Sequence, residues 1–92
     1  MIIQANSAEL GRAIRRRRRE RKMTIEDLAY DADIHPTYLS GIERGVRNPT
    51  WSKLNGIAYA LDVPVSALAR DAEVEAQIAQ RLREAQRELG LA

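Results

Sequence analysis

The sequence predicts an all-α fold, in which five short helices form a compact domain and a further helix follows at the C-terminus. The chain has 92 residues, of which 45% are hydrophobic and 30% are charged, and this composition suits one small domain. It contains one Trp, three Tyr and no Phe, so a core of Leu, Ile, Val and Ala is expected, which favours packed helices over a sheet. Apolar residues recur at helical spacing between capping residues along the chain.

The first predicted helix spans residues 8–21, with Ser7 as its N-cap. Five consecutive arginines, Arg15–Arg19, fall within it. Because successive residues of a helix are rotated by about 100°, these side chains point in all directions, and we expect most of them to form a solvated face. Arg17 falls on the apolar stripe of the helix, so it must extend its charged group past its own aliphatic stem.

Two short helices are predicted next, over residues 25–32 and 36–44. Thr24 begins the first with a capping box, and Gly45 ends the second as the residue after its C-cap. His35, between the two helices, is interpreted as a turn or N-cap residue. Two short helices joined by three or four residues form a helix-turn-helix pattern, whose second helix enters the major groove of DNA.

The last third of the chain predicts three more helices, over residues 51–61, 65–69 and 72–89. Thr50 caps the first of them, and Trp51 is interpreted as a core anchor at its start. The apolar residues of the last helix are spaced by four, three and four positions, which is typical of a seam between two helices. This stripe either packs on its own domain or pairs with a second chain.

The charge distribution divides the chain into a helix-turn-helix domain over residues 1–70 and a C-terminal amphipathic helix over residues 71–92. The first segment holds 12 basic and 8 acidic residues, for a net charge of +4, and the second holds 3 basic and 5 acidic residues, for −2. The basic segment is suited to face phosphates. Ile2 and Ile3 either form a frayed end or cover a dimer interface. The expected dimer contacts are Val65, Leu68, Ile78, Leu82, Ala85 and Leu89.

Three stretches carry a resemblance to a known family: Met23–Ala29, Tyr38–Gly45 and Arg47–Thr50. In residue types and spacing they resemble the Cro/Xre family of helix-turn-helix regulators, and Leu61–Pro64 is similar to the segment that leads into the family's fifth helix. The resemblance covers residues 9–69 and implies a lambda-repressor-like five-helix domain. Within the family, the third predicted helix is most similar to controller proteins of restriction–modification systems.

The resemblance implies that residues around the second helix of the motif bind DNA. Residues at the exposed start of that helix would read bases, Tyr38 would contact the backbone or bases near a bend, and residues beyond the helix would contact phosphates. In the family, an arginine pairs with the glutamate of this helix and keeps its guanidinium near the DNA. Arg18 matches that arginine, and Glu43 matches the glutamate. The first backbone amides after Thr50 form a further phosphate site. The residues expected to contact DNA are Arg18, His35, Pro36, Thr37, Tyr38, Ser40, Gly41, Arg44, Arg47, Asn48, Thr50 and Lys53.

Several positions depart from the family pattern. Ile25 stands where a glutamine that contacts a phosphate is usual, and Lys22 stands where glycine is usual. Pro36 and Gly41 replace residues that could form hydrogen bonds with a base. Direct base readers are therefore few, and more of the discrimination is left to the shape of the DNA.

Composition excludes several classes of chemistry. The chain has no cysteine and one histidine, which removes disulfides, zinc fingers, thiol catalysis and a multi-histidine metal site. It contains no nucleophile–histidine pair with an orienting group and no glycine-rich phosphate loop, so we expect neither an enzyme nor a cofactor. No stretch approaches about 18 apolar residues and the first residues lack the features of a signal peptide, so we expect a cytoplasmic protein without a membrane partner.

Two functions fit these observations. The first is a sequence-specific transcriptional regulator, such as a repressor, that binds double-stranded DNA as a homodimer on a pseudo-palindromic operator. The alternative is a protein-interaction module of the same fold, an antitoxin or a bridging factor, that binds a protein partner through the C-terminal helix. Residues 71–92 discriminate between them, because a toxin-binding tail is unfolded alone whereas a dimer helix is ordered.

Overall fold

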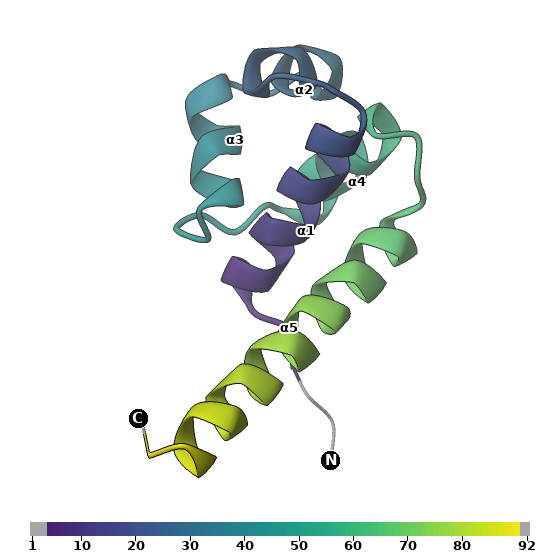
Figure 1. Cartoon of the computed structure of the whole chain (residues 1–92). Coiled ribbons are helices and arrows are strands. Elements are labelled where there is room, and N and C mark those ends of the chain that lie inside the picture. The colour runs from purple at the N-terminus through teal and green to yellow at the C-terminus, as the bar shows by residue number, and fades with distance from the viewer. Residues whose placement is uncertain (1–3, 91–92) are drawn as a thin grey trace.

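The computed structural model describes residues 4–90, in which four short helices pack into a small body and a longer helix extends from it (Figure 1). All regular structure in this part of the chain is helical, which confirms the predicted all-α class. Ile2 and Ile3 lie outside the described residues. Within residues 4–90, no helix is both long and apolar enough to cross a membrane. The helices are α1 Ser7–Glu20, α2 Ile25–Ala32, α3 Pro36–Glu43, α4 Trp51–Ala60 and α5 Val65–Glu88.

Helix α1 begins one residue earlier than predicted, and Asn6 rather than Ser7 is its N-cap. The Oδ1 atom of Asn6 accepts hydrogen bonds from the amides of Ala8 at 2.9 Å and Glu9 at 3.2 Å. In return, the Glu9 carboxylate accepts a hydrogen bond from the Asn6 amide at 3.1 Å, which completes a capping box. The prediction for Ser7 is wrong because Asn6 already fills the cap, and the Ser7 hydroxyl bonds to Asn48 instead.

The caps of α2 and α3 confirm the predictions for them. The Thr24 hydroxyl accepts from the Asp27 amide at 3.0 Å, and the Asp27 carboxylate accepts from the Thr24 amide at 2.9 Å. This bond from the Thr24 backbone lowers the pKa of the Asp27 carboxyl below its ordinary value. His35 caps α3, since its Nδ1 atom accepts from the Thr37 amide at 3.1 Å, and Gly45 follows the end of α3 with a φ of 79°.

The core lies where α1 to α4 meet the first turns of α5. Its largest fully buried side chains are Ile14, Leu28, Leu39, Ile42, Ile57, Leu61 and Leu68. The prediction of Leu68 as a dimer contact is therefore wrong, and Val65 packs against the same cluster. The prediction of Trp51 as a core anchor is also wrong, because its side chain is 71% exposed. The first three residues of α4 are all exposed, since this turn lies beyond the edge of the core.

Helix α5 is continuous over all of its 24 residues, so the predicted break between residues 69 and 72 is wrong. No glycine or proline separates the two predicted segments, and their alanines favour a helix. Asp71, at the predicted break, accepts a hydrogen bond from Nε of Arg17 on α1 at 2.6 Å. This bond raises the pKa of the Arg17 guanidinium above its ordinary value and helps to hold α5 on α1.

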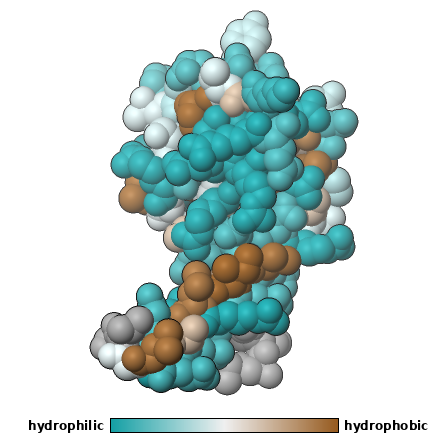
Figure 2. All heavy atoms as spheres, viewed as in Figure 1, coloured by the Kyte–Doolittle hydropathy of each residue, from teal (hydrophilic) through white to brown (hydrophobic). Residues whose placement is uncertain are grey.

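The second half of α5 leaves the body of the domain. Residues 81–90 are all exposed, whereas Ala72 and Ala76, further back on the same helix, are buried. A band of hydrophobic residues follows this extension in an otherwise largely hydrophilic face (Figure 2). Of the predicted stripe, Leu82 and Leu89 are 61% and 72% exposed, so its last turns do not pack on their own domain. The other alternative, pairing with a second chain, stays a prediction.

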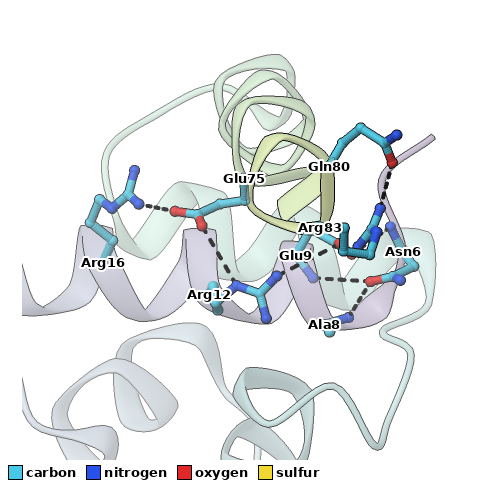
Figure 3. Close-up of polar contacts among 8 residues, drawn as sticks. All are labelled: Asn6, Ala8, Glu9, Arg12, Arg16, Glu75, Gln80 and Arg83. Atoms are coloured by element: carbon cyan, nitrogen blue, oxygen red, sulfur yellow. Dashed lines mark hydrogen bonds and ion pairs between the residues drawn. The ribbon is translucent and has the colours of Figure 1, made fainter. Parts of the chain in front are cut away.

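The arginines of α1 tie this helix to its neighbours. Arg16 forms an ion pair with Glu75 on α5, and Nε of Arg12 lies 3.5 Å from the other oxygen of the same carboxylate (Figure 3). Arg17 extends its charge from the apolar stripe, as predicted, and meets a carboxylate of α5. Four of the five side chains of Arg15–Arg19 are at least partly exposed, as predicted, and Arg18 alone is buried. Carboxylates of α3 and α5 pair with four of the five, which the sequence did not predict.

A buried ion pair joins α1 to the end of α3. The Glu43 side chain is 0% exposed, and its carboxylate accepts from Nε and Nη2 of Arg18 at 2.7 and 2.9 Å. Nη1 of Arg18 donates to the carbonyl of Met23 at 2.8 Å, and Nε of Arg15 adds a bond to Glu43 at 3.3 Å. The bond to Glu43 raises the pKa of the Arg18 guanidinium above its ordinary value. The structure confirms the Arg18–Glu43 pair that the resemblance implied.

Gly11 permits the close crossing of α1 and α3 beside this pair. A Cβ atom at residue 11 would lie 2.4 Å from the carbonyl oxygens of both Ile42 and Glu43. Because these atoms belong to the backbone, they cannot rotate away as the end of a flexible side chain could. The two helices therefore meet almost backbone to backbone, which fixes the position of α3 relative to α1.

We expect Arg18→Met to lower the free energy of unfolding by about 3–5 kcal/mol, because it removes the main partner of a buried carboxylate. Urea denaturation followed by circular dichroism measures this change. Arg19→Met is the matched control, since Arg19 is an exposed member of the same run, and its effect should stay within about 0.5 kcal/mol. Arg18→Met combined with Glu43→Met should be more stable than Arg18→Met alone, because no charge is left buried. Equal effects of Arg18→Met and Arg19→Met would contradict the structural role of the pair.

Candidate nucleic-acid interface

The helix-turn-helix consists of α2 and α3, which have eight residues each and are joined by a short turn. Asp33 takes a left-handed conformation with a φ of 57°, and the amide of Ile34 donates to the carbonyl of Ala29 at 3.0 Å. The chain therefore turns sharply between the helices. Leu39 and Ile42 bury one side of α3 in the core, and the opposite side remains at the surface.

The outward side of α3 carries two of the predicted base-reading residues, Thr37 and Ser40. Thr37 is exposed and Ser40 is half-buried, and a spacing of three positions places them on one face of the helix. Pro36, a third predicted residue, is half-buried at the first position of α3 and has no group that can donate a hydrogen bond. His35 is exposed beside them, with its Nδ1 atom engaged in the cap of α3. Two hydroxyl groups on a fixed helix are thus available to base edges.

Gly41 is buried beneath the side chain of Arg47, so its prediction as a base-reading position is wrong. A Cβ atom at residue 41 would lie 2.6 Å from Cγ of Arg47, and the Arg47 amide donates to the Gly41 carbonyl at 3.2 Å. The guanidinium carbon of Arg47 lies 5.5 Å from the ring centroid of Tyr38, which is a cation–π distance. Gly41 therefore positions Arg47 against α3. A glycine inside a short helix was the only sign of this role in the sequence.

Arg18 does not present its guanidinium at the surface as the resemblance implied. The residue is 8% exposed, and three of its nitrogens are engaged with Glu43 and Met23. In the structure this guanidinium positions α3. The exposed basic side chains near the end of α3 are Arg44 and Arg47.

The start of α4 carries the remaining predicted residues. The Thr50 hydroxyl accepts from the Lys53 amide at 3.3 Å, and both residues are exposed. Asn48 bonds through Oδ1 to the Ser7 hydroxyl, so it ties the loop to the first turn of α1. Trp51, which sequence reasoning placed in the core, stands exposed directly after Thr50. Trp51 therefore belongs to the surface at the start of α4. In the sequence, only its position one residue after the Thr50 cap could have indicated this exposure.

The assembled surface has the chemistry of a polyanion-binding site. Hydroxyl groups lie in the middle of the exposed side of α3, and the cationic side chains of Arg44, Arg47 and Lys53 surround the end of α3 and the start of α4. Between residues 4 and 90, no group of three or more His, Asp and Glu side chains is placed to hold a metal ion. The arrangement is suited to hydrogen bonds and charge contacts with a phosphate backbone.

The sequence matches a known domain family and named relatives. The family model described as "Helix-turn-helix domain" matches residues 9–71. The immunity repressor protein of Bacillus phage phi105 is 34% identical over 92 aligned residues, which cover 87% of this chain and 64% of the repressor. The chain therefore spans less than two thirds of the length of that relative.

Solved structures of two regulators share the fold. The restriction–modification controller protein C.Esp1396I, crystallised as a tetramer in complex with its natural 35 base-pair operator, is 35% identical with a TM-score of 0.71, and the match covers 77% of this chain and 93% of the controller. The clp gene regulator ClgR from Corynebacterium glutamicum is 31% identical with a TM-score of 0.71, covering 91% of this chain and 85% of ClgR. Because the family model matches well over half of its length, the chain belongs to the helix-turn-helix domain family, as its resemblance to Cro/Xre regulators predicted.

Proposed function

We propose that this protein is a transcription regulator that recognises operator DNA with α3 and acts as a homodimer. The observation that carries this proposal is the division of α3 into two sides. One side is fixed in the core by Leu39 and Ile42, and the other presents Thr37 and Ser40 beside exposed arginines. The relatives described above include a phage immunity repressor and a controller protein bound to its operator, which supports the same activity here.

On DNA, the N-terminal end of α3 lies in the major groove, which is about 12 Å wide and admits one helix. The hydroxyls of Thr37 and Ser40 meet base edges, and the Thr37 methyl group is suited to contact thymine. Arg44, Arg47 and Lys53 neutralise phosphates on either side of the groove, and the first backbone amides of α4 add a phosphate contact.

Direct base readout by this surface is sparse. Pro36 contributes no side-chain hydrogen bond, and Gly41 lies under Arg47. Short hydroxyl side chains form hydrogen bonds with several kinds of base edge, whereas long amide or arginine side chains select one base through two bonds. Part of the specificity therefore comes from the sequence-dependent shape of the operator.

The alternative function is a protein-interaction module that uses the second half of α5. The exposed hydrophobic band on this half favours a protein contact of some kind (Figure 2). However, residues 71–88 are helical in the single chain, which supports a preformed dimer helix over a tail that folds only on its partner. The helix-turn-helix family is a DNA-binding family rather than an enzyme family, and a cytoplasmic location follows from the proposed activity.

Selection of bound sequences from pooled duplex DNA tests the proposal directly. We expect the full chain to enrich a pseudo-palindrome whose half-sites are centred about one helical turn apart, roughly 34 Å. Repeating the selection at two salt concentrations should show a steep loss of affinity, because phosphate contacts dominate binding. Binding without an enriched sequence would contradict a specific regulator and would move the interaction module to first place.

Thr37→Ala should relax the sequence preference at one or two positions of each half-site. We expect the affinity for the selected operator to fall roughly fivefold, which corresponds to about 1 kcal/mol for one hydrogen bond and a methyl contact. Affinity for unrelated duplex DNA should stay the same, and fluorescence anisotropy measures both. Ser66→Ala, an exposed hydroxyl on α5, is the control and should change neither value. An equal loss on both kinds of DNA would show that Thr37 does not read bases.

Arg47→Ala should weaken binding to all duplexes and lower the slope of log K against log salt by about 0.9, the value for one phosphate contact. Gly41→Ala should have a smaller effect in the same direction, because its new methyl group displaces Arg47 without removing the charge. Salt titrations by anisotropy measure the slopes. Circular dichroism of Gly41→Ala establishes that α3 remains folded. A slope that is unchanged in Arg47→Ala would exclude this residue from the phosphate contacts.

A further inference from the structure

An apolar stripe runs along α5 from Val74 to Leu89, and the rest of the domain covers less and less of it toward the C-terminus. Val74 is 42% exposed, Ile78 45%, Leu82 61% and Leu89 72%, so exposure increases along the helix as it leaves the body. Figure 2 shows these hydrophobic residues as a continuous band on one side of the extension. A contiguous apolar band of this kind on a small soluble domain marks an interaction surface.

The spacing of the stripe fits a helical partner. Ile78, Leu82, Ala85 and Leu89 are separated by four, three and four residues, which is the seam of a two-helix coiled coil. The two edges of this seam differ in charge. One edge carries Arg81 and Glu88, seven residues apart, and the other carries Ala79 and Gln86.

We propose that this stripe packs antiparallel against the same stripe of a second copy of the chain. This inference deepens the homodimer part of the proposed function and rests on it. In this pairing Ile78 meets the partner's Leu89, and Leu82 meets the partner's Ala85. By symmetry, each contact occurs twice. The overlap covers residues 78–89, which include the exposed last turns of α5 from residue 81 onward, so the two bodies lie at opposite ends of the pair.

The charges on the edge of the seam favour the antiparallel direction. In antiparallel coiled coils, corresponding edges of the two helices face each other, so Arg81 meets the partner's Glu88 and Glu88 meets the partner's Arg81. In a parallel pair, opposite edges face each other, and Arg81 would meet the uncharged Gln86 of the partner subunit. The chain is thus complementary to itself in one direction only.

The sizes of the apolar residues favour the same direction. A parallel pair would place Ala85 opposite the partner's Ala85 and leave a poorly filled layer between two leucine layers. The antiparallel pair places Ala85 opposite the partner's Leu82, so that large and small side chains alternate across the seam. A second copy therefore fills the stripe more evenly in the antiparallel arrangement than in the parallel one. The antiparallel arrangement also pairs both charges on the edge of the seam.

Charge exchange in the full chain tests the pairing without DNA. Sedimentation equilibrium should show that Arg81→Glu and Glu88→Arg each weaken the homodimer at least tenfold, because each replaces two attractive contacts with two repulsive ones. The double variant should return to within about threefold of the unchanged chain, since exchange of both charges restores the two contacts. Arg83→Glu, on the outer side of α5, is the matched control and should have no effect. The proposal would be overturned if neither Arg81→Glu nor Glu88→Arg changed the dimer affinity. It would also be overturned if the chain without substitutions were a monomer.

Disulfide cross-linking establishes the direction independently, because the chain has no cysteine of its own. A mixture of I78C and L89C proteins should form a mixed disulfide under mild oxidation. L89C alone should not cross-link, because the two Leu89 positions lie about 16 Å apart along an antiparallel pair, beyond the ~7 Å between Cα atoms that a disulfide spans. Efficient cross-linking of L89C to itself would indicate parallel helices and would overturn the proposal. These measurements contain no DNA, so their failure is distinguishable from a failure of operator selection.

Discussion

The Glu43 carboxylate is buried at the C-terminal end of α3, where the dipole of the helix already concentrates negative charge. Arg18 neutralises this charge with two hydrogen bonds, and Arg15 adds a third from the same helix. The contact holds only because Gly11 allows α1 to cross within touching distance of the α3 backbone. The orientation of the proposed DNA-binding surface therefore depends on three features of α1, none of which belongs to the helix-turn-helix itself.

Helix α1 connects this buried ion pair to α5. Its outer arginines meet Glu75 (Figure 3) and Asp71, so much of the positive charge of the run is paired within the protein. Five consecutive arginines therefore occur in this helix-turn-helix protein with most of their charge engaged inside the domain. The cations left for phosphates lie instead on the far side of α3 and at the start of α4, where Arg47 is positioned by Tyr38 and Gly41.

In the proposed dimer, helix α5 links the helix-turn-helix body to a second copy of the chain. Its first half belongs to the core through Leu68 and Ala72, and its last turns, from residue 81 onward, are exposed and carry the end of the apolar band. Because the helix is continuous, a partner bound to the second half is connected to the body without a flexible joint. The spacing between two recognition helices in a dimer is then set by helix geometry, which is the property that an operator with two half-sites requires.

The sequence by itself determined the helices, most of their caps and the family, because these depend on local spacing and on residues such as Thr24, His35 and Gly45 that act on their immediate neighbours. Tertiary structure decided which side chains are buried and which are available. Arg18, Gly41 and Leu68 were assigned to contacts outside the domain, but other residues of the folded chain enclose them: Glu43, Arg47 and the core, respectively. Trp51 was assigned to the core and is exposed, because the edge of the core is a property of the assembled helices. Periodicity gives the direction in which a side chain points along its own helix, but only packing determines whether another element covers it.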